Sequence, residues 1–344
     1  MCRVFHGTLH IVMYCFFFLK FQNLYQMINK IFNEDCLTGL KKLPAGTVDC
    51  CVSSPPYWGL RDYGVDGQVG NENEYIEFVD RLVEIYSEVY RVLKPAGTCF
   101  VNLGDTFAGS GNGTTTKADT SKYIENSKQV YVLPNGTAKS SKFRGTSLNK
   151  SLLMIPERFA IKMIDSGWIL RNQIIWHKPN QMPSSAKDRF TVDFEKIFFF
   201  VKQPKGYYFE QQLEPYTKPL DRWAGDKLEA SGTSEWDKGT KQTTYRNRNM
   251  RPNENGKNMR TVWSINTKPF KEAHFAVFPE KLATRMIKSG CPENGLVLDP
   301  FMGAGTTAVT AISLNRNFVG FELNSDYCKL IHKRLSDTHG LFLK

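Results

Sequence analysis

The chain of 344 residues is long enough to bury a substantial core, and 41% hydrophobic with 23% charged residues excludes a disordered or fibrous protein. Its length suggests one large domain or two smaller ones. The formal net charge of +11 favours a polyanionic partner, nucleic acid first, although an incidentally basic protein would carry the same charge.

Residues 1–26 differ in composition from the rest of the chain. Their apolar run, residues 11–19, is too short for a membrane span of about 20 residues. Lys20 and Gln22 follow where a signal peptide would have small residues at its cleavage site. The segment from Met27 looks like the natural start of a first strand. We therefore expect residues 1–26 to be an upstream extension of the reading frame or a disordered segment, and we expect no membrane partner.

From Met27 onward, short apolar runs alternate with segments of helical periodicity. The run 48–53 predicts a strand that the following prolines terminate, and residues 76–93 predict a helix that stops at residues 95–97. The later predicted elements are strand 98–103, helix 152–165, strands 168–176, 196–201 and 296–298, helix 306–314, strand 318–321 and helix 326–335. This alternation indicates an α/β protein with a mainly parallel sheet covered on both faces.

Two segments lack this alternation. Residues 107–150 are rich in Gly, Ser, Thr, Asn and Lys, which predicts a long mobile loop. Residues 205–271 combine aromatic and asparagine side chains with many cations, which suits contacts to phosphates and base edges. A solvated basic loop is the alternative. The candidate DNA-binding residues there are Arg246, Arg248, Arg251 and Arg260.

Eight cysteines are scattered along the chain. No Cys-x-x-Cys pair or neighbouring histidine pair completes a zinc site. The spacing therefore predicts reduced thiols, a cytoplasmic location and no bound metal.

The first segment that suggests chemistry is Ser-Ser-Pro-Pro-Tyr-Trp, residues 53–58, at the end of a predicted strand. Ligands of open α/β sheets bind at the carboxyl ends of strands, so this turn should face a site. The prolines keep the backbone rigid, so the Ser54 hydroxyl and the Pro55 carbonyl can accept hydrogen bonds from one amino group. Tyr57 and Trp58 supply flat faces for a planar base. The alternative is a proline turn with buried aromatic side chains.

The second segment is Leu-Val-Leu-Asp-Pro-Phe-Met-Gly-Ala-Gly-Thr-Thr, residues 296–307. Gly303 and Gly305 allow close approach of a ligand, and Glu322 can accept hydrogen bonds from both ribose hydroxyls. The pattern Gly-x-Gly-x-x-Ala also leaves a nicotinamide-dependent oxidoreductase as an alternative. Only residues 306–344 follow this loop. The other strands must come from the N-terminal side, so the sheet is predicted to be circularly permuted relative to the usual nucleotide-binding order.

The two segments, in this order, resemble the amino-group DNA methyltransferases of the β class. In that family the Ser-Pro-Pro-Tyr motif precedes a target-recognition region and the cofactor motif comes last. The similarity runs from Met27 to about Leu335 and includes residues 102–105, 176–180 and 274–280. The resemblance implies a circularly permuted Rossmann-like S-adenosylmethionine-dependent methyltransferase sheet with an inserted target-recognition region. It also implies S-adenosyl-L-methionine as cofactor and double-stranded DNA as partner.

The family's functional residues can be matched one by one. Those of the catalytic turn are Ser54, Pro55, Pro56 and Tyr57. Those of the cofactor pocket are Asp35, Phe278, Pro279, Asp299, Phe301, Gly303, Gly305, Thr306 and Glu322. By resemblance, Glu322 holds the ribose, Asp35 accepts from the adenine amino group, and Phe278 and Pro279 close over the cofactor. Alternatively, Asp35 caps a helix, Pro279 opens one and Phe278 belongs to the core.

The resemblance also implies a mechanism in which the target base is flipped out of the duplex. Tyr57 stacks on this base, while Ser54 and the Pro55 carbonyl bind its amino hydrogens. Serine at the first motif position favours N4 of cytosine, with N6 of adenine as the alternative. An RNA or protein-glutamine methyltransferase is less favoured, because those usually carry Asn or Asp first and lack the permuted order.

The predicted organisation has three parts after the extension. Residues 27–204 form the catalytic half of the methyltransferase domain, residues 205–271 the target-recognition region and residues 272–344 the cofactor-binding half. The resemblance further suggests a monomer or homodimer, a bacterial, archaeal or phage origin, and a cognate restriction endonuclease as partner.

Overall fold

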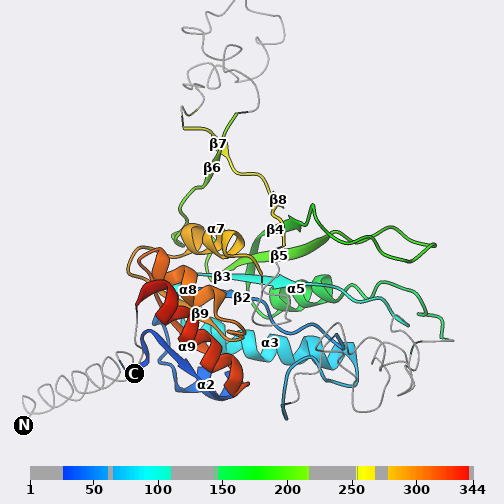
Figure 1. The fold of residues 1–344 in the computed structure, drawn as a ribbon, viewed down its shortest axis with the longest axis horizontal. Coiled ribbons are helices and arrows are strands. Elements are labelled where there is room, and N and C mark those ends of the chain that lie inside the picture. The colour runs from blue at the N-terminus through cyan, green and yellow to red at the C-terminus, as the bar shows by residue number, and fades with distance from the viewer. Residues whose placement is uncertain are drawn as a thin grey trace, which may run out of the picture. The chain divides into compact units, whose positions relative to one another are not determined.

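The computed structural model describes residues 26–60, 65–109, 143, 146–216, 253, 255–267 and 278–340, which belong to two compact units (Figure 1). The first unit comprises the chain up to Glu210 and the chain from Thr261 onward, and the second is Gln211–Arg260. Nearly all of the expected extension 1–26 and most of the predicted loop 107–150 lie outside the described residues.

An eight-stranded sheet organises the first unit, in the order β1-β10-β9-β2-β3-β5-β4-β8. Its strands are β1 (Lys30–Phe32), β2 (Val48–Ser53), β3 (Leu93–Leu103), β4 (Ile169–His177), β5 (Phe194–Val201), β8 (Val262–Ser264), β9 (Leu296–Asp299) and β10 (Asn317–Phe321). Neighbouring strands from β1 to β3 are parallel, as are β4 and β8, whereas β5 is antiparallel to both its neighbours. The predicted mainly parallel α/β sheet is confirmed.

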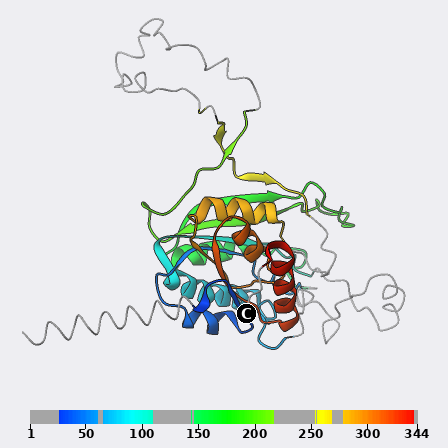
Figure 2. The ribbon, with the colours of Figure 1, turned by 60° about the vertical axis from the view of Figure 1, so that its left-hand side comes forward.

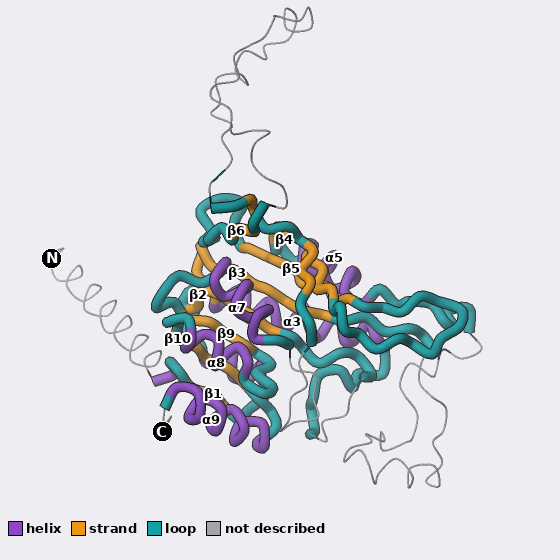
Figure 3. Tube along the Cα trace, turned by 45° about the horizontal axis from the view of Figure 1, so that its top comes forward, coloured by secondary structure: helices purple, strands orange, loops and turns teal. Residues whose placement is uncertain are grey.

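Helices cover both faces of this sheet (Figures 2 and 3). They are α2 (Cys36–Lys42), α3 (Tyr75–Val92), α5 (Ile155–Asp165), α7 (Glu280–Gly290), α8 (Thr306–Ser313) and α9 (Ser325–His339). Successive side chains of a strand point to opposite faces. Phe100 therefore lies against Gly290 of α7, while Cys99 and Val101 join the core cluster that contains Leu82 of α3.

One predicted helix end was wrong, for an identifiable reason. The helix predicted from residue 152 begins only at Ile155, because Leu152 forms a bridge with Phe107 and Met154 has a left-handed backbone with φ 55°. The helix predicted over 76–93 is observed at Tyr75–Val92, within one residue at each end, and Leu93 is already extended and begins β3. Residues 36–42 and 280–290, which form α2 and α7, were not predicted as helices.

The sheet order places distant segments side by side. Strands β9 and β10 come last in the chain, yet they lie between β1 and β2. This order is compatible with the predicted permutation. Because β1, β10, β9 and β2 are parallel, Ser53, Asp299 and Phe321 end their strands at one edge of the sheet. The predicted catalytic turn, which follows Ser53, and the glycine loop, which follows Asp299, both begin at this edge.

The second unit, Gln211–Arg260, spans fewer residues than the predicted recognition region 205–271. It contains the antiparallel strands β6 (Leu213–Glu214) and β7 (Lys257–Asn258). The exposed Arg260 donates from Nε to Glu214 at 2.6 Å. Strand β8, by contrast, belongs to the first unit. The other three candidate DNA-binding residues, Arg246, Arg248 and Arg251, lie outside the described residues.

Candidate active site

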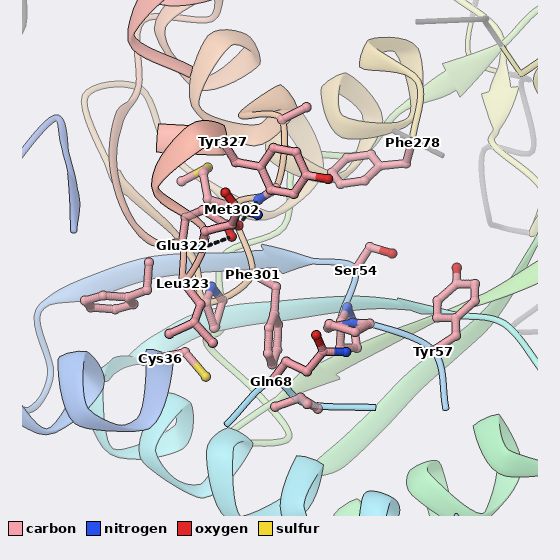
Figure 4. Close-up of a pocket in the computed structure, with 18 of the residues that line it drawn as sticks. Cys36, Ser54, Tyr57, Gln68, Phe278, Phe301, Met302, Glu322, Leu323 and Tyr327 are labelled. Atoms are coloured by element: carbon pink, nitrogen blue, oxygen red, sulfur yellow. Dashed lines mark hydrogen bonds between the residues drawn. The ribbon is translucent and has the colours of Figure 1, made fainter. Parts of the chain in front are cut away.

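A cavity of about 260 Å³ lies at the carboxyl edge of the sheet. Its size is near the lower end of small-molecule pockets, which measure roughly 300–1,000 Å³. Figure 4 shows Glu322, Met302 and Tyr327 on one side of this cavity and Ser54 and Tyr57 on the other. The two segments singled out in the sequence therefore face one cavity.

All four predicted residues of the catalytic turn line the cavity: Ser54, Pro55, Pro56 and Tyr57. The Tyr57 ring lies against Gly104, where an added Cβ would come within 2.5 Å of Tyr57 Cε2. Glycine is therefore required at position 104 for this ring position. Trp58 does not share the site, since it is 1% exposed and its Nε1 donates to the Glu72 carbonyl at 3.0 Å.

A hydrogen-bond network holds the Tyr57 hydroxyl. This hydroxyl donates to Glu195 Oε2 at 2.6 Å, and Asn102 Nδ2 donates to the same carboxylate oxygen at 2.6 Å and to the Tyr57 hydroxyl at 2.8 Å. Asn102 Nδ2 also lies 3.4 Å from Ser54 Oγ, and Lys178 forms an ion pair with Glu195. Both members of that ion pair are largely buried and line the cavity.

No role was predicted from the sequence for the residues that hold the Tyr57 hydroxyl. Asn102 and Lys178 lie in the stretches 102–105 and 176–180, which resemble the family, but the resemblance did not indicate what these two residues do. Glu195 lay in no motif. Its position in the site depends on the pairing of β5 with β3, which places Lys196, the next residue, opposite Leu103.

Glu322 occupies the other side of the cavity, just after β10. Its Oε2 accepts from the Gly303 N–H and its Oε1 from the Asn324 N–H, both at 2.8 Å. Burial raises the pKa of Glu322 above its ordinary value. Each carboxylate oxygen retains a lone pair that can accept from a ligand hydroxyl.

The glycine loop follows β9 and turns into α8. Three of the residues predicted to bind the cofactor, Phe301, Gly303 and Thr306, line the cavity, whereas Gly305 does not. Gly305 has φ +79°, and an added Cβ would lie 2.5 Å from the Ile331 side chain. A glycine is needed at position 305 so that the loop can pack against α9 and turn into the helix.

Asp299 also lies behind the cavity wall and does not line it. It is 1% exposed; Oδ1 accepts from the Phe301 N–H at 2.9 Å and Oδ2 from the Thr307 hydroxyl at 2.6 Å. Asp299 therefore ties the two ends of the glycine loop together. Burial raises its pKa from 3.8 to about 7.

This raised pKa predicts a pH-dependent stability. Between about pH 4 and pH 7 the unfolded chain has lost the Asp299 proton while the folded chain retains it, so the free energy of unfolding falls as pH rises. At 1.36 kcal/mol per pKa unit, we expect wild type to lose roughly 2–3 kcal/mol relative to Asp299→Asn between pH 5 and pH 8. Urea unfolding of both proteins at the two pH values measures this difference. Identical pH dependence would contradict the assigned burial.

The three remaining predicted residues are placed differently from one another. Asp35 lines the cavity and also caps α2, accepting from the Thr38 N–H at 2.9 Å. Phe278 lines the cavity and is half-buried. Pro279 is buried at the start of α7, where its carbonyl accepts from the Leu282 N–H at 2.8 Å. Within the described residues, Pro279 therefore acts as the helix-opening residue that the sequence also allowed.

The cavity fits a nucleoside-containing cofactor. The Glu322 and Asp35 carboxylates can accept from hydroxyl and amino groups, and the rings of Phe301, Phe278 and Tyr327 supply apolar walls. Cys36 also lines it, and burial raises the pKa of its thiol to about 12, which disfavours the thiolate form. Among the described residues, no group of His, Cys, Asp or Glu could hold a metal ion. No described helix has the length and apolar character needed to cross a membrane.

The sheet and the two-sided cavity define a methyltransferase-type α/β protein. The chain belongs to the DNA methylase family of N6 and N4 methyltransferases, whose family model matches residues 48–333.

Relatives of known name agree with this assignment. The Type II methyltransferase M.Cfr9I of Citrobacter freundii is 37% identical over 305 residues, covering 89% of this chain and 87% of the relative. The Type II methyltransferase M.SmaI of Serratia marcescens is 36% identical over 308 residues, covering 89% and 90%.

Solved structures share the fold. PvuII DNA methyltransferase, which is cytosine-N4-specific, superimposes with a TM-score of 0.57 at 20% identity, covering 90% of this chain and 87% of that one. A putative DNA modification methylase of Thermus thermophilus, solved with S-adenosyl-L-methionine, has a TM-score of 0.54 at 22% identity, covering 91% and 95%.

Proposed function

We propose that this protein transfers a methyl group from S-adenosyl-L-methionine to an exocyclic amino group of a base in double-stranded DNA, with N4 of cytosine as the favoured target. The observation that carries this proposal is the single cavity faced by the Ser54–Tyr57 turn and by Glu322. A cofactor held by Glu322 and an amino group held by Ser54 would meet inside it.

The cofactor, when bound, supplies an electrophilic methyl group. The protein's own part is to hold the amino group. The Ser54 hydroxyl and the Pro55 carbonyl accept hydrogen bonds from its two N–H groups, which orients the nitrogen lone pair toward the methyl group. Formation of the N–C bond would break the donor's methyl–sulfur bond, and the methylated nitrogen would then release one proton to solvent. Tyr57 stacks on the flipped base. Rate enhancement by this arrangement comes from positioning and from acceptors placed where positive charge develops on nitrogen.

Cofactor binding is divided between direct and supporting residues. Glu322 holds the ribose, and Asp35 accepts from the adenine amino group. Phe278, Phe301, Gly303 and Thr306 form the walls of the cavity. Asp299, Gly305 and Pro279 do not line the cavity and support it indirectly. Asp299 and Gly305 fix the conformation of the glycine loop, and Pro279 fixes the start of α7.

The DNA partner is supported by the net charge of +11 and by the family. We place target recognition in residues 205–271, with Arg246, Arg248, Arg251 and Arg260 as phosphate or base contacts. The relatives' names, Type II methyltransferases, support a cognate restriction endonuclease as partner.

N4 of cytosine is favoured over N6 of adenine for two reasons. Serine stands at the first position of the motif, and the structural neighbour from the PvuII system is named cytosine-N4-specific. Adenine also offers an amino group beside a ring acceptor, so the same turn can accommodate it.

The test is transfer of labelled methyl from S-adenosyl-L-methionine to unmethylated duplex DNA, followed by nucleoside digestion and mass spectrometry. We expect N4-methylcytosine. N6-methyladenine would keep the mechanism and overturn the target base. Label in RNA or protein but none in DNA would overturn the proposed substrate.

A further inference from the structure

The loop between β4 and β5, residues 178–193, exposes large apolar side chains. Phe190 is 95% exposed and Met182 is 81% exposed. The loop extends from the ends of β4 and β5 away from the sheet (Figures 1 and 3). Two apolar side chains of this size that are almost fully exposed on one loop make this loop a candidate surface for contact with a partner.

The loop has a defined internal structure. At its base the Lys178 N–H donates to the Asp193 carbonyl at 2.7 Å, and the Asn180 side chain accepts from the Thr267 N–H at 2.9 Å. Farther out, the Ser184 N–H donates to Thr191 Oγ1 at 3.0 Å. A loop whose backbone is held by such hydrogen bonds loses less conformational freedom on binding than an unstructured segment does.

The loop also starts and ends at the cavity. Lys178, its first residue, lines the cavity, as does Glu195, which follows the loop on β5. A partner that contacts the loop is therefore adjacent to the place where the amino group would be held. This position favours the macromolecule that carries the substrate over an unrelated partner.

The loop carries three cations, Lys178, Lys187 and Arg189, against two acids, Asp188 and Asp193, so its formal charge is positive. Lys187 and Arg189 both precede the exposed Phe190, and the Arg189 guanidinium lies 3.8 Å from the centre of the Phe107 ring. Asp188, the acid between them, is paired with Lys150 at 2.6 Å. Cations next to exposed Phe and Met side chains are the combination with which proteins contact phosphates and insert a wedge between base steps.

We propose that the 178–193 loop is a DNA wedge: Phe190 and Met182 enter the duplex beside the base that is extruded, while Lys187 and Arg189 contact the neighbouring phosphates. This inference rests on the proposed function. The wedge lowers the energetic cost of leaving the helical stack, because its apolar side chains occupy space next to the vacated position.

Photo-cross-linking tests the contact without knowledge of the recognition sequence. Phe190 is replaced by the photoreactive p-benzoylphenylalanine in the full chain, and Ile161, which is 59% exposed on α5, is replaced in the same way as a matched control. With unmethylated plasmid DNA and S-adenosyl-L-methionine, we expect a DNA adduct from position 190 and none from position 161. An adduct between two protein chains from position 190, or no DNA adduct, overturns the proposal.

Kinetics test whether the contact serves base flipping. We expect Phe190→Ala to lower kcat/KM on duplex DNA about 10-fold or more, with cofactor affinity unchanged, since a single well-placed apolar contact is worth roughly this factor. Phe190→Leu should recover most of the activity, and Ile161→Ala should match wild type. Full activity of Phe190→Ala sinks the wedge. If Phe190→Ala is fully active and wild type methylates DNA, the wedge is refuted and the proposed function stands. If wild type neither binds nor methylates DNA, the wedge and the proposed function are both overturned.

Discussion

Replacement of Tyr57 by alanine is expected to lower kcat about 100-fold while leaving the dissociation constant of S-adenosyl-L-methionine unchanged. Tyr57 lies at the end of the cavity away from Glu322, so its loss misplaces the base without touching the cofactor's ribose site. Ser54→Ala should show the same pattern, because it removes an acceptor for an amino hydrogen. Single-turnover methylation and calorimetric titration of the cofactor measure the two quantities.

The conservative variants separate stacking from positioning. Tyr57→Phe retains the ring but loses the hydroxyl held by Glu195 and Asn102, so we expect a smaller decrease of about 10-fold. Glu195→Gln should produce a similar decrease. The two effects should add only partly in the double variant, because both changes weaken the hydrogen bond between Tyr57 and Glu195. Turnover of Tyr57→Ala equal to wild type would refute the assigned role, as would a large change in cofactor affinity.

Replacement of Glu322 by alanine is expected to weaken cofactor binding about 100-fold. Hydrogen bonds to charged groups contribute about 1.5–3 kcal/mol, and 1.4 kcal/mol corresponds to a factor of 10. The change also removes the partner of the Gly303 and Asn324 N–H groups, so the glycine loop loses a support. Glu322→Gln keeps the shape and one acceptor oxygen, and should weaken binding about 10-fold.

The pH dependence of cofactor binding provides a second readout. Only the ionised Glu322 can accept hydrogen bonds at both oxygens. Because burial raises its pKa, affinity in wild type should fall on acidification at a higher pH than an ordinary glutamate would cause. Glu322→Gln should lack this decrease. Calorimetry across the acidic range measures it, and thermal unfolding checks that each variant is folded. Undiminished affinity in both variants would show that the ribose is held elsewhere.

Much of the fold follows from local sequence patterns. The strand at β2 was predicted with its observed bounds, 48–53, because a short apolar run ends at two prolines. The helix at α8 was predicted within one residue of its observed end for a similar reason: it directly follows a glycine turn. The short helix α2 and the two-residue strands β6 and β7 carry too few residues for periodicity to show.

In the candidate site, too, residues in local motifs were predicted and residues brought together by strand pairing were not. Residues whose chemistry is local were predicted: Ser54 and Tyr57 follow a proline turn, and Gly303 and Glu322 follow the ends of strands. Residues whose role depends on pairing were missed. Glu195 contacts the Tyr57 hydroxyl although 138 residues separate them in the sequence. Asp299 and Gly305 were predicted as cofactor-binding residues, and their place behind the cavity wall was not foreseen, because burial cannot be read from a motif.

The position of β10 between β1 and β9 has a consequence for synthesis of the protein. Asn29, just before β1, donates a hydrogen bond to Asn317, the first residue of β10, 288 residues later in the chain. A growing chain that has completed the catalytic turn still lacks the strands between β1 and β2, and with them the glycine loop and Glu322. Pairing over such long separations is slow, because the entropy of closing the loop must be lost before the contacts form. The cofactor cavity is thus completed only after β9 and β10 have been synthesised and have paired with β1 and β2.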